Sequence, residues 1–207
     1  MRDSVAPPLR PRAESHKSSS IASRYPGDQF QDFPEWLRLR VDRIATSWLS
    51  AVLDRDHRAS PQQTPLLDDF LRLLVSMLPA AMGPHRRQLD PVWQSAAELY
   101  GSFGVTRGLA SGEVVEEFQL LREGLIRMLF QEPPRSSGAS LFGSEVLRLN
   151  RFLDTGVTLA SVGHTDRLFF DLFQGGSRAS RITPEVVTEI RHQLADIEKE
   201  LRSVIGA

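Results

Sequence analysis

The chain has 207 residues, of which 41% are hydrophobic and 25% are charged, and its formal net charge is −1. This composition is ordinary for a soluble globular protein, and the length suits one domain with extensions or two small domains. The near-zero net charge gives no support for electrostatic binding to nucleic acid or to acidic lipid. The chain has no cysteine, which excludes disulfides, thiolate catalysis and Cys-ligated zinc or iron–sulfur clusters.

The sequence carries no membrane or export signal. No apolar run approaches the length of about 18 residues that a membrane span needs. Arg2 and Asp3 are followed by prolines and arginines instead of the apolar core of a signal peptide. Residues 1–30 are rich in proline, serine and charge, so we expect a disordered tail. We expect a cytoplasmic protein that does not contact a membrane.

Helical periodicity runs through most of the remaining chain, and no segment alternates with the period of two that strands show. Start signals such as Asp32-Phe33-Pro34, Thr64-Pro65 and Asp90-Pro91 each precede an apolar stripe. Together with Ser111 and a start near Ser144, they predict five helices between residues 31 and 173. This body is all-α and long enough to enclose a core.

A last amphipathic helix is predicted over residues 183–205, after a Gly/Ser-rich joint at 174–182 that contains Gly175 and Gly176. Its apolar residues alternate three and four apart, as in the seam of a coiled coil. Such a seam predicts a homodimer interface, and the alternative is a helix that packs back on its own domain. The predicted interface residues are Val187, Ile190, Leu194, Ile197, Leu201 and Val204.

Signals for catalysis, metals and cofactors are absent from the sequence. Gly101 and Gly104 follow no strand and precede no lysine, so they do not form a phosphate-binding loop. The five histidines are scattered, and none forms an i, i+4 pair with a glutamate, as a zinc site would require. We expect His85 to be solvated and His164 to lie on a helix surface. We therefore expect no catalytic residue, no metal and no cofactor.

One group of polar residues lies close to apolar positions on three of the predicted helices. Asn150 and Asp154 are four residues apart and share a helix face. Either these side chains form exposed ion pairs of little energetic value, or they form a half-buried network that fixes helix packing or lines a pocket. The candidates are Arg107, Glu117, Arg122, Asn150 and Asp154.

Several motifs resemble one sensor family. They are Glu98-Leu99-Tyr100-Gly101, Arg107-Gly108, residues 113–118 with Leu121-Arg122, and residues 149–154, with Trp48-Leu49 on the opening helix. Over residues 34–172 the chain resembles the N-terminal domain of RsbR/RsbRD-type stress regulators, which also precedes some bacterial sensor histidine kinases. The resemblance implies a globin-like fold without haem that dimerises and passes a signal to an output module.

The chain departs from that family after residue 173, where no STAS-type module or kinase core follows. The resemblance therefore implies a non-enzymatic sensory domain that depends on a partner or stands alone, with a kinase, phosphatase or transcription regulator as the signalling partner. Two alternatives stay open. One is a globin-like protein that binds haem or another small ligand, with His85 or His164 as the axial haem ligand, and the other is a structural coiled-coil adaptor.

Overall fold

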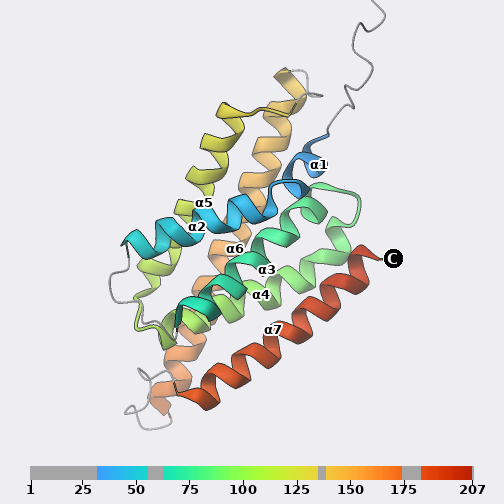
Figure 1. Cartoon of the computed structure of the whole chain (residues 1–207). Coiled ribbons are helices and arrows are strands. Elements are labelled where there is room, and N and C mark those ends of the chain that lie inside the picture. Colours follow the sequence, from blue (N-terminus) through green and yellow to red (C-terminus); the bar gives the residue numbers. More distant parts are fainter. Residues whose placement is uncertain (1–31, 56–62, 135–138, 174–182, 207) are drawn as a thin grey trace, which may run out of the picture.

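The computed structural model describes residues 32–55, 63–134, 139–173 and 183–206 (Figure 1). Within these ranges the chain forms helices and no strand, so the predicted all-α fold is confirmed. The helices are α1 (Phe33–Arg38), α2 (Val41–Arg55), α3 (Gln63–Met82), α4 (Arg86–Thr106), α5 (Ser111–Gln131), α6 (Ala139–Phe173) and α7 (Pro184–Ile205). None of them is long and apolar enough to cross a membrane. The expected tail and the expected glycine joint lie outside the described residues.

Several helices begin at the predicted capping signals. The carboxylate of Asp32 accepts a hydrogen bond of 2.9 Å from the backbone N–H of Glu35 at the start of α1. The Thr183 hydroxyl caps α7 in the same way, through the N–H of Val186. At α5 the cap residue is Ala110, one residue before the expected Ser111, and the Glu113 carboxylate accepts from its backbone N–H at 2.7 Å. These contacts satisfy N–H groups that have no partner within the helix.

Three helix boundaries differ from the prediction. The expected first helix is divided into α1 and α2, because the chain turns at Leu39 and the Arg40 N–H bonds to the Leu37 carbonyl at 2.9 Å. The third predicted helix corresponds to α4, which begins at Arg86 and not at Asp90, so Pro91 lies inside α4. Near a helix start the missing proline N–H removes only one intrahelical hydrogen bond, which makes this position tolerable. Helix α6 begins at Ala139, earlier than the expected Ser144.

The centre of the fold is a close crossing of α4 and α6, which glycines make possible. A Cβ atom on Gly101 of α4 would lie 1.9 Å from the Ala160 carbonyl oxygen of α6. A Cβ on Gly163 of α6 would lie 2.0 Å from the Glu98 carbonyl oxygen of α4. Any side chain at these two positions would collide with backbone, so the two helices could not approach this closely. Gly101 is therefore a packing residue within a continuous helix.

The other helices surround this crossing (Figure 1). Helix α3, the most apolar one, packs on α1, α2, α4 and α7, and α5 packs on α2 and α6. Eleven residues of α3 are buried, which explains why the apolar stripe of this helix is wide.

Helix α7 lies along α3 and α4 of its own chain (Figure 1). Ile190, Leu194, Ile197 and Leu201 are only 5–7% exposed, and Val187 and Val204 pack partly buried beside them. The alternative of a helix that packs back on its own domain thus describes the structure. The stripe predicted as a dimer interface is covered within the chain, since an apolar stripe has the same spacing whether another chain or its own body covers it.

Candidate functional site

The predicted polar cluster divides into two separate groups. Arg107 and Glu117 form a buried ion pair, with side chains 1% and 3% exposed. Arg122 and Asp154 form a second pair, between α5 and α6, in which the Asp154 side chain is 61% exposed. Asn150 joins neither pair in the contacts described, because its amide nitrogen donates to the Val146 carbonyl of its own helix at 3.0 Å. The five candidates therefore do not form one network.

The buried pair has bidentate geometry. Arg107 Nη2 donates to Glu117 Oε1 at 2.6 Å, and Arg107 Nη1 donates to Glu117 Oε2 at 2.9 Å. The Tyr100 hydroxyl donates to the same Oε2 atom at 2.5 Å. Three charge-assisted hydrogen bonds thus converge on one carboxylate, which offsets the cost of removing it from water. We call Tyr100, Arg107 and Glu117 the buried polar triad.

Local backbone geometry places the arginine of the triad. Arg107 caps the C-terminus of α4, and Gly108 follows with φ of 78°, a left-handed conformation that glycine adopts without strain. The Leu109 N–H then bonds to the Gly104 carbonyl at 2.9 Å, which closes the turn. Glu117 lies on the inner face of α5. The buried polar triad therefore ties the end of α4 to the helix that follows.

Aromatic rings enclose the triad. Tyr100 lies 5.6–6.1 Å, between ring centroids, from Trp48, Phe70 and Phe118. The Trp48 indole N–H donates to the Glu117 backbone carbonyl at 2.7 Å, which brings α2 into the same contact. Burial, and after it the negative charge of Glu117, raises the pKa of Tyr100 well above its usual value of 10. The phenol therefore remains a hydrogen-bond donor at physiological pH.

Tyr100 was missed as a site residue, although the sequence contains a signal for it. Tyr100, Phe103 and Arg107 are spaced i, i+3 and i+7, which places them on one face of α4. The Phe103 ring lies 5.6 Å from the Arg107 guanidinium carbon, in a cation–π arrangement. An arginine in register with two buried aromatic residues indicates a buried cation, and that requires a buried acid elsewhere.

The prediction that His164 lies on a helix surface is wrong. Its side chain is 2% exposed on α6, and Nε2 lies 2.8 Å from the Leu109 carbonyl oxygen in the α4–α5 connection. A Cβ atom on Gly104 would lie 2.5 Å from a side-chain methyl carbon of Val114, so the glycine lets α5 pack closely beside the imidazole ring. Because a carbonyl oxygen only accepts, Nε2 is the donor, and this hydrogen bond holds the α4–α5 connection against α6. His164 therefore has a structural contact of its own.

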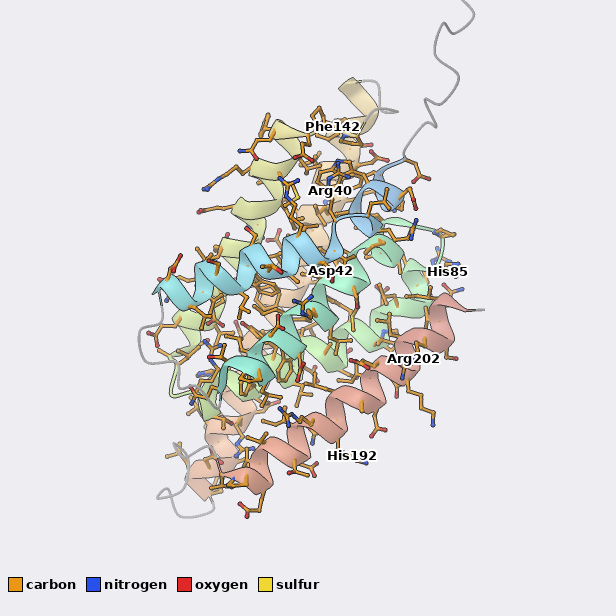
Figure 2. All side chains as sticks on the ribbon, in the orientation of Figure 1. Arg40, Asp42, His85, Phe142, His192 and Arg202 are labelled. Carbon is orange, nitrogen blue, oxygen red and sulfur yellow. The ribbon has the colours of Figure 1, made fainter. Side chains whose placement is uncertain are left out.

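The other histidines of the described chain lie apart. His85 precedes α4 and is partly exposed, and His192 lies on α7 with a side chain that is 75% exposed (Figure 2). Among the residues that the structure describes, no group of three or more His, Asp or Glu side chains is placed to hold a metal ion. The geometry described here therefore offers a polar triad for packing and no ligand set for a metal.

Comparisons with known proteins add no relative. No protein-family model matches the chain. No curated protein and no solved structure matches it either.

Proposed function

We propose that this protein is a non-enzymatic sensory or regulatory domain of bacterial signal transduction, which acts in the cytoplasm through homodimerisation and through binding of a signalling partner. The observation that carries the proposal is the convergence of motif residues on one contact. Trp48, Tyr100, Arg107 and Glu117 come from four separate motifs that resemble RsbR-type sensor domains. In the structure Trp48, Tyr100 and Arg107 each donate a hydrogen bond to Glu117. A shared buried contact is the expected role of motifs that specify helix packing.

The chemistry of the triad favours a structural role over a catalytic one. The acidic and basic groups of Glu117 and Arg107 hydrogen-bond to each other in the interior, where a substrate would not reach them. A buried bidentate pair selects one arrangement of the helices that carry it, because any other arrangement would leave a charge without a partner. This is the property that a packing switch needs.

Two helix contacts of unequal strength suggest how a signal would travel. The α4–α6 crossing is closed by backbone against backbone, so it resists displacement. The α5–α6 contact includes the surface pair Arg122–Asp154, which is weak and sensitive to salt. A stimulus or partner that favours one packing of α5 on α6 would then shift the population between two states. The end of α6, which leads toward the joint and α7, would report that shift.

Capture of the signalling partner tests the proposal. The full chain, tagged and immobilised, is incubated with native lysate of the source bacterium together with Asp154→Asn and Glu123→Gln variants. We expect a kinase, phosphatase or transcription regulator to bind in stoichiometric amount, and Asp154→Asn to change that amount because it weakens the α5–α6 pair. Glu123 is an exposed acid on α5 with no ion pair described, so Glu123→Gln controls for the loss of one charge.

Two outcomes would contradict the proposed function. If the folded chain captures no kinase, phosphatase or transcription regulator, the proposed signalling role is contradicted. A stoichiometric Soret band in the absorbance spectrum of the purified protein would favour the alternative of a haem-binding globin-like protein.

A further inference from the structure

The outer face of α6 carries a second stripe with the spacing of a coiled coil. Its residues alternate three and four apart over five turns, and all of them are exposed. Val162 is 43% exposed, Phe169 56% and Leu172 69%, although each is apolar. The stripe, which we call the α6 seam, consists of Thr155, Thr158, Val162, Thr165, Phe169 and Leu172.

The threonine hydroxyls of the α6 seam are hydrogen-bonded within their own helix. The Thr155 hydroxyl donates to the Arg151 carbonyl at 3.0 Å, and the Thr158 hydroxyl to the Asp154 carbonyl at 3.0 Å. The Thr165 hydroxyl likewise donates to the Ser161 carbonyl at 2.8 Å. Each hydroxyl is therefore satisfied within its own helix, which leaves the methyl group for outside contact. The α6 seam behaves as a continuous apolar surface.

The seam lies opposite the face that α6 uses inside the fold. Gly156, Ala160 and Gly163 face α4 and the core. At 100° per residue, Val162 and Phe169 point away from them. Helix α6 is thus apolar on two sides, and a helix that is apolar all round is normally covered all round. In the described structure only one of these sides is covered.

The exposed apolar area is sufficient for a stable interface. Leu168 and Phe173 flank the seam and are 42% and 89% exposed. With aromatic side chains of about 150–250 Å² each, the seam and its flanks expose on the order of 600 Å². This reaches the upper end of about 300–600 Å² for the largest patch of a typical monomer. Two such patches together reach the range of about 1,200–2,000 Å² that specific interfaces bury.

We propose that the α6 seam binds the α6 seam of a second copy of this chain, antiparallel, about a twofold axis between Val162 and Thr165. The inference rests on the proposed function and names the surface through which the homodimer forms. In this register Leu172 faces Thr155 of the partner copy, and Phe169 faces Thr158 of the partner copy. Each bulky residue then meets a small one, which lets the two surfaces interdigitate. A parallel pair would instead place Phe169 against Phe169 and threonine against threonine.

Charge and sequence argue against other occupants. Around the bulky end of the seam, Asp166 and Asp171 outnumber Arg167, and Arg167 pairs with Asp171 in its own helix. Within the described part of α6, this end of the seam has no excess of positive charge that would attract anionic lipid or nucleic acid. Residues 174–182, which follow α6 directly, contain a single large apolar residue, Ile182. That segment is too polar to match the seam, whereas a second copy supplies an identical apolar surface.

Solution oligomeric state tests the inference on the full chain. Light scattering and sedimentation should give a dimer for the wild type and a monomer for Phe169→Asp, with a dissociation constant raised at least about 100-fold because a charge would be buried in the seam. Leu147→Asp is the matched control, since Leu147 is 61% exposed on the same helix but lies outside the seam. That variant should remain dimeric. At concentrations low enough for the wild type to be monomeric, both variants should keep the wild-type denaturation midpoint.

Disulfide trapping tests the antiparallel register. The chain has no native cysteine, so a Thr155→Cys copy mixed with a Leu172→Cys copy should give a mixed disulfide on mild oxidation. Neither single variant should cross-link to itself in the antiparallel arrangement. Self-cross-linking of both variants without the mixed product would overturn the register.

Three results would contradict the proposal that the α6 seam is the dimer interface. A Phe169→Asp variant that stays dimeric places the interface elsewhere and leaves homodimerisation intact as part of the proposed function. A monomeric wild type removes the dimer, while partner capture from lysate still judges the signalling role separately. Wild-type binding to phosphatidylglycerol–phosphatidylethanolamine vesicles that Phe169→Asp abolishes, with no dimer present, would identify the seam as a membrane contact.

Discussion

The guanidinium of Arg107 and the carboxylate of Glu117 face each other in the protein interior through two parallel hydrogen bonds of 2.6 and 2.9 Å. These residues are ten positions apart: Arg107 caps the end of α4, Glu117 lies on α5, and Gly108 is at the turn between the two helices. Because both charges are desolvated, each depends on the other, and the pair sets how α5 leaves α4. The same carboxylate also holds Tyr100, so the loss of either charge affects three residues.

Removal of one charge from the pair should destabilise the fold severely. Arg107→Ala leaves the Glu117 carboxylate buried without its cation, and we expect a loss of about 3–5 kcal/mol in the free energy of unfolding. Chemical denaturation followed by circular dichroism measures the loss. The double variant Arg107→Met/Glu117→Leu should lose less than Arg107→Ala does, because it leaves no unpaired charge.

Asp154→Ala is the surface control for that experiment. The sequence placed Asp154 in a candidate network, whose half-buried form would make this change costly. The observed exposure of its side chain instead predicts a cost below about 1 kcal/mol. A cost of Asp154→Ala equal to that of Arg107→Ala would contradict the division of the cluster into a buried and an exposed pair.

Substitution of the crossing glycines should be damaging in a way that helix propensity does not predict. Gly163→Ala places a methyl group against the Glu98 backbone of α4, so the helices must separate, at a cost of about 3 kcal/mol or more. Gly124→Ala in α5 meets nothing within 4 Å and should stabilise the protein by about 0.4–1 kcal/mol. Denaturation midpoints compare the two variants. Equal effects at both positions would show that α4 and α6 do not cross as closely as described.

Leu194→Ala tests whether α7 packs on its own body. Leu194 is 5% exposed against the fold, and a buried leucine truncated to alanine costs about 2–5 kcal/mol. The expected result is a lower denaturation midpoint with no change in oligomeric state. The neighbouring Ala195 is exposed, so Ala195→Asp is the matched control on the same helix and should leave the midpoint unchanged. A Leu194→Ala variant that alters oligomeric state at constant stability would restore α7 as a dimer interface.

The shifted pKa of Tyr100 predicts a dependence on alkaline pH. An acid whose folded pKa lies above its unfolded value keeps its stabilising contribution below the unfolded pKa, near 10, and loses it as the pH rises through the folded value. Wild-type stability should therefore fall above pH 10 more steeply than that of Tyr100→Phe. The chain has two tyrosines, so an ultraviolet titration of the folded protein should leave at least one phenol, that of Tyr100, protonated near pH 10. Ionisation of both near pH 10 would contradict the burial of Tyr100.

Local sequence patterns were sufficient to predict the helices, because amphipathic spacing and capping residues act within a few positions along the chain. Asp32 and Thr183 cap α1 and α7 as expected. The sequence does not predict the break at Leu39–Arg40, since an apolar stripe continues across it without interruption. The sequence predicts the start of α4 too late, because a proline inside the first turns has the same local pattern as a proline at the first helical position.

Tertiary structure alone decided which surfaces meet. The stripe on α7 and the seam on α6 have the same spacing, yet the fold covers the first and leaves the second exposed. Likewise, Arg107 and Glu117 became a buried pair while Arg122 and Asp154 became an exposed one, although all four were candidates for one cluster. The periodicity of a sequence indicates that a helix has an apolar face. Which surface covers that face depends on how distant segments of the chain pack. Here the glycines at 101 and 163 determine that packing, because only they allow the α4 and α6 backbones to touch.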